Sequence, residues 1–373
     1  MMDNTHARAA AIAAADKLIL KAGTRLLIDR ASIAALVSGI AALRDAGKQV
    51  LLVSSGAVGM GMEAVGLATR PRELAQTQAL AAIGQSRLMS IYAEEAERHG
   101  FKVAQMLLTA YDFSRRERCL NIRNCINALW EKGILPIVNE NDSVSVDELK
   151  FGDNDTLSAM MASITGAKLA VILTTVDGLL DRNSDGTLGK RIPVVEKLDD
   201  SLRALAGGTD DGNFSIGGMS SKLTAAEIAC TAGAYMWIAD GRMENICRKL
   251  LDGADVGTLF LPTRKLSGRK RWFGYLKKSS GTITVDDGAF EAVKKRGKSL
   301  LPSGAVSADG EFRRGDTVNI ADRNGRVFAR GLVNFDAAEC RKILGCQSGE
   351  LHKVLGADAD EELVHRDNLL LLL

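Results

Sequence analysis

The sequence lacks the glycine-rich patterns that mark the two most familiar nucleotide-binding folds. No segment of its 373 residues fits the P-loop pattern G-x-x-x-x-G-K-[ST], and Lys222 follows a glycine pair at the wrong spacing for one. The nearest match to a dinucleotide fingerprint is Gly59-Met60-Gly61 with Ala64, which tight packing explains equally well. These absences disfavour a P-loop kinase and a Rossmann dehydrogenase.

Cysteine and histidine are scarce and scattered along the chain. The six cysteines show no C-x-x-C spacing, and none of the four histidines lies near a cysteine at the spacing of a zinc site. No Ser-His-Asp arrangement can be argued from these histidines, and we assign them no role. We expect reduced, mostly buried thiols, which are typical of a cytoplasmic protein.

Signals for secretion and for membrane insertion are also missing. The N-terminal segment MMDNTHARAAAIAAADK has an early acid and no leucine-rich stretch. The longest apolar runs fall short of the roughly 20 residues that a membrane helix needs. We therefore expect a cytoplasmic protein with no membrane partner. The five leucines Leu369–Leu373 fit a packed tail, an oligomer contact or a frayed terminus.

The sequence does contain a regular alternation of strand-like and helix-like segments, from about Asp16 to Phe260. Apolar runs such as QVLLVSS alternate with amphipathic stretches such as residues 31–47. With 373 residues, 46% of them hydrophobic and 25% charged, the chain is long enough for two domains. We predict an α/β first domain at residues 1–262, with a mainly parallel central sheet covered on both faces.

A smaller, β-rich second domain is predicted at residues 270–368. Proline, glycine and consecutive cations interrupt the apolar pattern between Pro262 and Arg271, and short strands with turns follow. The segment from Arg264 to Lys342 holds 18 Lys or Arg and 9 Asp or Glu, so its net charge is +9 and the rest of the +2 chain carries −7. Such a basic domain favours RNA binding. A solvated surface that docks on the acidic first domain explains the charge equally well.

A polar loop that feeds a helix is the most suggestive segment of the first domain. The run from Asn139 to Ala159 is crowded with Asp, Glu and Asn, and Asp153, Asn154 and Asp155 stand where the helix would begin. Side-chain oxygens and backbone N–H groups would converge there, beside the partial positive charge of the helix N-terminus. Such a place can hold both an ammonium group and an anion, as an amino acid or a phosphorylated substrate requires. Alternatively, it is a solvated loop with an ordinary N-cap.

Three further strand or helix junctions carry similar chemistry. The first strand ends in Lys21 and Gly23, the next leads into small residues at 54–61, and residues 216–234 begin a helix with glycines, serines and Lys222. Such turns can cradle phosphate or carboxylate. Because open α/β sheets bind ligands at the carboxyl ends of their strands, we expect these segments to meet at one edge. A turn or cap explains each alone, but together they favour a binding site.

Ten short motifs give the chain a resemblance to the glutamate 5-kinase family. In the first domain they are SSGAV (54–58), GQSRL (84–88), QMLLT (105–109), RERCLN (116–121), NEND (139–142), FGDNDTLSA (151–159) and GGMSSKL (217–223). In the second domain they are RKRWF (269–273), ITVDDGA (283–289) and VHRDN (364–368). The resemblance implies an amino-acid-kinase fold, a three-layer sandwich, with a C-terminal PUA domain. It also implies ATP-dependent phosphorylation of the γ-carboxylate of L-glutamate, the first step toward proline.

The resemblance implies roles for individual residues as well. Lys21 and Lys222 would neutralise charge on the transferred phosphoryl group, and Asp155 would orient both lysines. Gly23 and Gly56 would offer backbone N–H groups to phosphoryl or carboxylate oxygens. The residues implied to hold glutamate are Ser55, Gly56, Asp142 and Asn154. Those implied to line the nucleotide pocket are Lys21, Gly23, Thr174, Thr175, Ile216, Gly217, Gly218, Met219, Ser220, Ser221 and Lys222.

The chain departs from the family pattern at a few positions. Arg25 stands where the family more usually has a serine, so a phosphate contact from that position is not carried over. The family varies at Val176 and Asp177, which follow the two nucleotide-pocket threonines.

Cofactors and partners follow from the same resemblance. ATP implies Mg²⁺ to bridge its phosphate charges, held mostly by phosphate oxygens and water, and we name no protein ligand for it. Family members are commonly inhibited by L-proline and form dimers or tetramers. We therefore expect a homo-oligomer in which proline competes with glutamate beneath the loop at residues 141–152.

Two kinds of alternative remain. Acetylglutamate kinase, aspartokinase and uridylate kinase share the implied fold, but the paired NEND and FGDND motifs and the PUA-like tail argue against them. An RNA-binding protein whose C-terminal domain carries the main function is the alternative from a different class. The spread of site-like residues over the first 222 positions favours catalysis.

Overall fold

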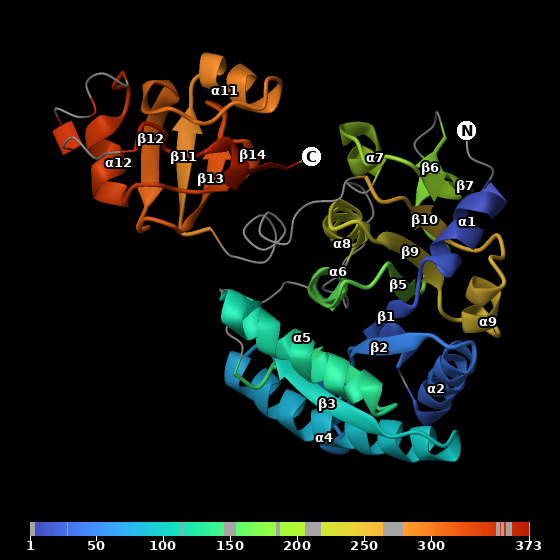
Figure 1. The fold of residues 1–373 in the computed structure, drawn as a ribbon. Helices are drawn as coiled ribbons and strands as arrows, with labels where there is room; N and C mark the ends of the chain where they lie inside the picture. The colour runs from blue at the N-terminus through green and yellow to red at the C-terminus, as the bar shows by residue number, and fades with distance from the viewer. Residues whose placement is uncertain are drawn as a thin grey trace. The chain divides into compact units, whose positions relative to one another are not determined.

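The computed structural model of the chain describes residues 4–27, 29–113, 115–144, 154–183, 187–205, 218–263, 279–347, 351, 354–355 and 360–372. The chain divides into two compact units, Met1–Lys265 and Leu266–Leu373. Figure 1 colours the first from blue to yellow and the second from orange to red. The domain limits expected at residues 262 and 270 flank this division, around which residues 264–278 lie outside the described part.

An eight-stranded sheet forms the middle of the first unit. Its strands are β1 (Lys17–Ala22), β2 (Gln49–Ser54), β3 (Val103–Leu108), β4 (Leu135–Glu140), β5 (Leu169–Thr174), β8 (Val194–Val195), β9 (Tyr235–Asp240) and β10 (Thr258–Phe260). The spatial order is β3-β4-β2-β1-β5-β9-β10-β8, and every neighbouring pair is parallel except β9 with β10. A separate ribbon pairs β6 (Leu180–Arg182) with β7 (Leu188–Arg191). The predicted mainly parallel sheet is confirmed.

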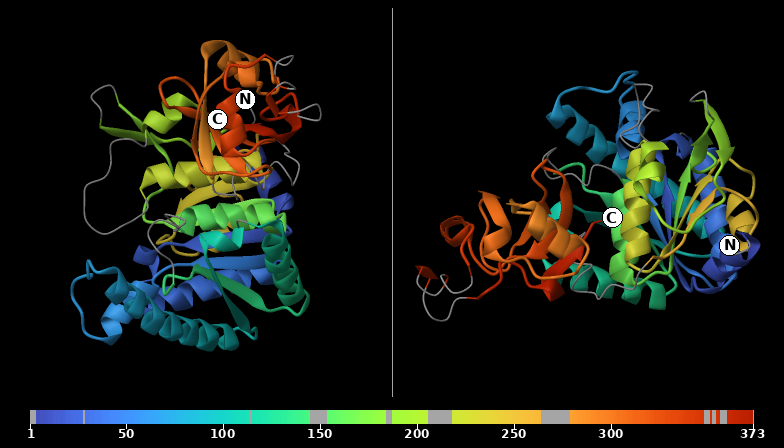
Figure 2. Two further views of the ribbon diagram at one scale, coloured as in Figure 1. Left: turned by 90° about the vertical axis from the view of Figure 1, so that its left-hand side faces the viewer. Right: turned by 90° about the horizontal axis from the view of Figure 1, so that it is seen from above.

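Helices cover both faces of this sheet. They are α1 (Asn4–Ala13), α2 (Arg30–Asp45), α3 (Ala57–Ala64), α4 (Leu74–Arg98), α5 (Arg116–Glu131), α6 (Asn154–Thr165), α7 (Asp200–Leu205), α8 (Met219–Thr231) and α9 (Ile246–Leu251). In Figure 1, α5, α6 and α8 lie along one face, and α1, α2, α4 and α9 lie along the other. Figure 2 shows the same layers from two further directions. The unit is therefore the three-layer sandwich that the resemblance implied.

The alternation of side chains along β1 explains how the first unit is built. Leu18, Leu20 and Ala22 join a buried core with residues of α1, α2 and α9. Lys21 points to the opposite face, where it meets Asp155 of α6. One strand thus contributes apolar contacts to one layer and a cation to the other.

Strand β1 is also the place where the strand order reverses. The chain continues from β1 to β2 on one side and later returns to β5 on the other side of β1. Ligands of open α/β sheets bind beyond the carboxyl ends of the strands at such a point. Lys21 is the second-last residue of β1 and therefore lies at the expected place.

Helices α3 and α4 approach each other closely through two glycines. A side chain at Gly61 would overlap the carbonyl of Leu80, and one at Gly84 would overlap the carbonyl of Ala57. Gly61 of the weak dinucleotide-like pattern therefore serves helix packing, whereas a Cβ at Gly59 would meet nothing within 4 Å.

The second unit is a five-stranded sheet with its own core. Its strands and helices are β11 (Gly281–Val285), α11 (Asp287–Lys294), β12 (Ala305–Gly310), β13 (Thr317–Ala321), β14 (Val327–Leu332), α12 (Ala337–Ile343) and β15 (Leu369–Leu371). In the ITVDDGA motif, β11 ends and the Asp286 side chain caps α11 by accepting a hydrogen bond from Ala289 N (2.7 Å). Strand β15 pairs with β14, and Leu369 and Leu370 are buried, so the leucine run is a packed tail as far as it is described.

Two further expectations concern the chain as a whole. Within the residues described, no helix is long and apolar enough to cross a membrane.

All six cysteines are free thiols, and four of them, Cys119, Cys230, Cys247 and Cys340, are buried. Burial raises the pKa of Cys230 to about 12, so this thiol stays protonated at neutral pH. The prediction of mostly buried thiols is confirmed, and their reduced state stays a prediction.

Candidate active site

Five loops meet where the parallel strands of the first unit end. Strands β4, β2, β1, β5 and β9 run in the same direction and are neighbours in that order, so their last residues share one edge of the sheet. Gly23 follows β1, Ser55 and Gly56 follow β2, Asp142 follows β4, and Thr175 follows β5. The sequence prediction that these segments share one edge is therefore met by the topology of the sheet.

The centre of this edge holds a buried carboxylate between two lysines. Lys21 Nζ lies 2.5 Å from Asp155 Oδ1, and Lys222 Nζ lies 3.1 Å from Asp155 Oδ2. Asp155 is 0% exposed, Lys21 5% and Lys222 6%. Ser221 adds a hydrogen bond, because its Oγ donates to Asp155 Oδ2 (3.3 Å). We call Lys21, Asp155 and Lys222 the charged triad.

The charged triad carries one positive charge more than its own carboxylate can balance. Within this set of three residues two ammonium groups contact one carboxylate, and all three side chains are buried. An excess charge away from water is costly unless a counter-ion reaches it. The arrangement is therefore chemically suited to an anion that approaches the two ammonium groups.

The backbone N–H of Gly23 is not available for the role that the resemblance implied. Its N–H donates to the carbonyl oxygen of Leu173 (3.2 Å), so this donor is engaged in the sheet. A Cβ here would lie 3.6 Å from Lys21 Nζ, which is an ordinary van der Waals distance, so packing does not require glycine at this position. The missing side chain leaves space beside the Lys21 ammonium group.

A second, uncharged group of side chains surrounds Asn154, the first residue of α6. Its Nδ2 lies 2.8 Å from Ser55 Oγ, 3.0 Å from the Ser54 carbonyl oxygen and 3.0 Å from Asn139 Oδ1. Three acceptors around one atom assign it as the amide nitrogen. The Asn154 Oδ1 atom is buried and has no hydrogen-bond partner among the described residues. Within the described part of the chain it is thus an acceptor without a donor, as a ligand with an N–H group would require.

This group extends away from Asn154 through α4. Asn139 Nδ2 donates to Gln85 Oε1 (2.9 Å), and both residues are buried. Ser54 Oγ is hydrogen-bonded to Tyr92 Oη (2.9 Å), and burial raises the pKa of that phenol, so it stays protonated. We call Gln85, Asn139, Asn154 and Ser55 the amide group, since amides provide most of its contacts.

The remaining residues implied to hold glutamate lie beside the amide group. Gly56 follows Ser55 directly, adopts a left-handed conformation (φ 100°) and is the N-cap of α3. Asp142 is half-buried in the turn three residues beyond Asn139. Asp153 and residues 145–152 lie outside the described residues.

The residues implied to line the nucleotide pocket fall on two segments. Thr174 ends β5 and pairs with Asp240 of β9, and Thr175 follows it, both of them half-buried. Helix α8 begins after Gly218, and Met219 and Ser221 of its first turn are half-buried while Ser220 is exposed. Ile216 and Gly217 lie outside the described residues.

Comparison with known proteins identifies the family. Residues 16–240 match the Amino acid kinase family, and residues 281–355 match the PUA domain. The glutamate 5-kinase of Caldanaerobacter subterraneus subsp. tengcongensis is 42% identical over 367 residues, which cover 95% of this chain and 98% of that protein. The chain belongs to the glutamate 5-kinase family. The relative from Syntrophus aciditrophicus is 43% identical over 361 residues, with 95% and 93% covered.

Membership of the glutamate 5-kinase family makes the chain a kinase with an amino-acid-kinase unit and a PUA unit. The glutamate 5-kinase of Pseudomonas entomophila is 42% identical over 369 residues, which cover 97% of this chain and 99% of that protein. Among solved structures, the carbamate kinase from Giardia lamblia bound to AMP-PNP aligns with a TM-score of 0.47 at 18% identity. That alignment covers 68% of this chain and 100% of that chain.

Two residues of the amide group were not predicted from the sequence. Asn139 belongs to the NEND motif and Gln85 to the GQSRL motif, yet neither was given a role. The motifs themselves were the available signal. What the sequence could not supply was the distance, because Gln85 and Asn139 are 54 residues apart and meet only when α4 packs beside β4.

Proposed function

We propose that the protein transfers the γ-phosphoryl group of ATP to the γ-carboxylate of L-glutamate, the first step toward proline. A carboxylate oxygen forms a bond to the γ-phosphorus while the bond from that phosphorus to the β–γ bridging oxygen breaks. The products are γ-glutamyl phosphate and ADP. The acceptor is already an anion, so the reacting oxygen has no proton to lose. The observation that carries the proposal is the charged triad, in which Asp155 holds two lysines at one place.

The charged triad suits phosphoryl transfer for an electrostatic reason. Such a reaction depends on in-line positioning and on stabilising the charge of the transferred group. Lys21 and Lys222 would each contact that group, and a unit charge pair at about 4 Å contributes around 4 kcal/mol at an effective dielectric constant of about 20. Asp155 would orient both lysines and keep their ammonium groups from repelling each other.

The amide group suits the amino acid. Glutamate has an α-ammonium group that needs acceptors, and Asn154 Oδ1 is a buried acceptor with no donor among the described residues. Asp142 would add a negative charge near the same ammonium group, and Ser55 and Gly56 would contact a carboxylate. These contacts would form before the reaction begins, so they would contribute mainly to the affinity for bound glutamate in the ground state.

ATP would bind on the β5 side of the charged triad. Thr174, Thr175 and the segment Ile216–Lys222 would line its pocket, and Gly23 would leave room beside Lys21. Among the residues described, no group of three His, Cys, Asp or Glu could hold a metal ion. Mg²⁺ would therefore be carried mainly by the phosphate oxygens and water, where it would balance their charge.

Three further features belong to the same proposal. L-Proline would inhibit by occupying the amino-acid pocket, so it should raise the KM for glutamate. The protein would act as a cytoplasmic homo-oligomer, a dimer or a tetramer. The basic PUA unit would bind RNA as a second function, tested by salt-sensitive binding of RNA to the full chain.

The direct test is a hydroxamate assay, in which hydroxylamine traps the acyl phosphate. Glutamate, N-acetylglutamate, aspartate and UMP are offered in turn with MgATP; hydroxylamine reports the three carboxylates, and ADP release reports all four. We expect ATP-dependent hydroxamate and ADP formation with glutamate alone. Activity with UMP or N-acetylglutamate in place of glutamate would overturn the proposal.

A further inference from the structure

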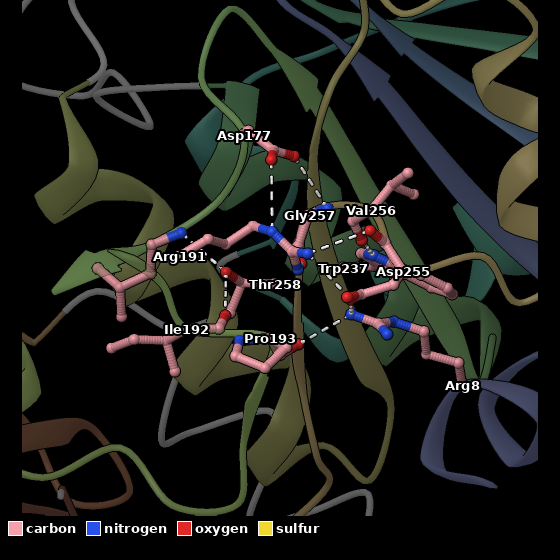
Figure 3. Close-up of polar contacts among 11 residues, drawn as sticks. Arg8, Asp177, Arg191, Ile192, Pro193, Trp237, Asp255, Val256, Gly257 and Thr258 are labelled. Carbon is pink, nitrogen blue, oxygen red and sulfur yellow. Dashed lines mark hydrogen bonds and ion pairs between the residues drawn. The ribbon is translucent and has the colours of Figure 1, made fainter. Parts of the chain in front are cut away.

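A row of alternating charges connects helix α1 to the loop that follows β5 (Figure 3). Arg8 Nη2 lies 2.6 Å from Asp255 Oδ1, and Arg191 Nη2 donates to the same oxygen at 2.9 Å. Arg191 Nε lies 3.3 Å from Asp177 Oδ2. We call Arg8, Asp255, Arg191 and Asp177 the charge row. Its members come from four segments that are distant in the sequence.

Arg191 occupies the centre of the charge row and uses its whole guanidinium group. Besides both carboxylates, it donates through Nη1 to the Gly257 carbonyl oxygen and through Nη2 to the Asp255 carbonyl oxygen (3.1 Å). Gly257 N donates in turn to Asp177 Oδ1 (3.0 Å). Both oxygens of Asp177 are therefore held, one by a cation and one by a backbone N–H. A flexible lysine could not make this planar set of contacts.

The opposite end of the charge row is fixed in the core. The Arg8 side chain is 2% exposed, and its guanidinium carbon lies 5.7 Å from the centre of the Trp237 ring. Arg8 Nη2 also donates to the Pro193 carbonyl oxygen at 3.4 Å. Trp237 is itself held, because its Nε1 donates to the Val256 carbonyl oxygen (2.8 Å). A fixed cation at this end gives Asp255 and Arg191 a defined position.

The charge row ends on the loop that carries the two nucleotide-pocket threonines. Asp177 is two residues beyond Thr175, whose carbonyl oxygen accepts a hydrogen bond from Arg242 Nη2 (2.8 Å). The Thr174 carbonyl oxygen accepts one from Gly241 N (2.8 Å). None of the hydrogen bonds of the described residues uses the hydroxyl groups of these threonines. The protein thus fixes the backbone of the loop while both hydroxyls face no protein partner in the described part.

We propose that the charge row positions the Thr174–Asp177 loop for the adenine nucleotide, with Arg191 as the positioning residue. This inference rests on the proposed function, because it takes Thr174 and Thr175 as nucleotide contacts. Arg191 touches neither reacting group; it acts through Asp177. A loop held in its bound shape binds its ligand without first being ordered, so the charge row contributes to ATP affinity. The charge row has no contact with the amide group, so its loss should leave glutamate binding unchanged.

The test is Arg191→Ala in the full chain. We expect the KM for ATP to rise about tenfold, while kcat at saturating ATP and the KM for glutamate stay within about twofold. The affinity for a nonhydrolysable ATP analogue, measured by calorimetry without glutamate, should fall by a similar factor. The matched control is Arg248→Ala, which removes an exposed arginine paired with Asp252 on α9. It should change neither KM.

Two milder variants test the same inference if Arg191→Ala does not fold. Asp177→Asn keeps the shape and an acceptor for Gly257 N but removes the charge that Arg191 contacts, so we expect about a threefold rise in the KM for ATP. Arg191→Lys keeps the charge without the planar contacts. Its KM for ATP should exceed that of the unaltered protein and should not exceed that of Asp177→Asn.

The outcomes separate this inference from the proposed function. An unchanged KM for ATP in Arg191→Ala and Asp177→Asn, or equal rises in the KM for ATP and for glutamate, would overturn the positioning role. If the unaltered protein makes no hydroxamate from glutamate, the proposed function fails. The calorimetric titration still tests the inference in that case, and absence of nucleotide binding by the unaltered protein would overturn it.

Discussion

The two halves of the candidate active site use opposite kinds of chemistry. The charged triad consists of three ionised side chains on β1, α6 and α8, with Asp155 completely buried. The amide group consists of neutral side chains joined by hydrogen bonds of 2.8–3.0 Å. Both halves meet at the first two residues of α6, where Asn154 belongs to one and Asp155 to the other.

The difference between the halves teaches which step each can serve. Charges that face a group whose own charge changes during the reaction lower the barrier, so the charged triad should act on kcat. Neutral amides that surround an amino acid make similar contacts before and during the reaction, so the amide group should act on the KM for glutamate. Variants in the two halves should therefore differ in which kinetic constant they change.

The largest effect is expected from Lys21→Ala or Lys222→Ala. Losing a charge contact of about 4 kcal/mol should lower kcat about a thousandfold, with the thermal unfolding temperature showing that the variant is folded. Lys168→Ala is the matched control, because Lys168 is exposed and lies just before the amino end of β5. Either lysine variant with an unchanged kcat would leave that lysine without a role in the mechanism.

Asp155→Asn should have the next largest effect. The variant keeps the shape of the side chain but removes the negative charge that both buried ammonium groups contact. We expect kcat to fall about a hundredfold and the free energy of unfolding to fall by about 3 kcal/mol. MgATP should then raise the unfolding temperature of the variant more than that of the unaltered protein, because phosphate replaces the missing charge. Equal increments in both proteins would contradict this account of the triad.

Substitutions in the amide group and at Asp142 beside it should change the other kinetic constant. Asn154→Ala and Asp142→Asn each remove a group that would face the substrate ammonium, a contact worth about 2 kcal/mol. We expect the KM for glutamate to rise about thirtyfold, with a much smaller decrease in kcat. Initial rates over a range of glutamate concentrations give both constants. A fall in kcat with an unchanged KM for glutamate would contradict the assignment of these residues to glutamate binding.

A smaller effect on the same constant is expected from Gln85→Leu. Gln85 Oε1 accepts a hydrogen bond from Asn139, which in turn contacts Asn154, so we expect its loss to act mainly through the position of Asn154. We expect about a threefold rise in the KM for glutamate and an unchanged KM for ATP. Gln76→Leu on the exposed side of the same helix is the control. If both variants behave alike, the hydrogen bond to Asn139 does not position Asn154.

The smallest effect concerns acid stability, and it lies outside both halves. A hydrogen bond from Arg191 lowers the pKa of Asp255 from its ordinary value of 3.8. The ionised form therefore stabilises the fold above that value, and this contribution is lost as the pH falls below it. Asp255→Asn should flatten the dependence of unfolding free energy on pH between about 5 and 3 by less than about 1 kcal/mol, because Asp255 is largely exposed. A steeper dependence in the variant would reverse the sign of this account.

The positions of Lys21, Ser55, Gly56 and Asp142 could be predicted from the sequence because each follows or ends a strand. In a parallel sheet the ends of the strands share an edge, so local patterns predict that such residues gather there. The fold class followed from the same alternation of strands and helices. Motif resemblance then supplied residue roles that spacing alone could not.

Contacts between distant elements could not be predicted in the same way. Lys222 reaches Asp155 because α8 packs beside α6, and 67 residues separate the two side chains. The engaged N–H of Gly23 depends on Leu173 of the neighbouring strand, and the charge row depends on Arg8, 247 residues from Asp255. Such distances are set by packing between layers, which no local pattern in one sequence records.

The measurement that tests the central claim most directly is a crystal structure of the protein with L-glutamate, Mg²⁺ and a nonhydrolysable ATP analogue. The account predicts that the Nζ atoms of Lys21 and Lys222 both lie about 2.7–3.2 Å from oxygens of the terminal phosphoryl group. The glutamate γ-carboxylate should lie in line with that group, and the ammonium group should lie beside Asn154 Oδ1. A structure in which the two lysines contact different ligands would contradict it.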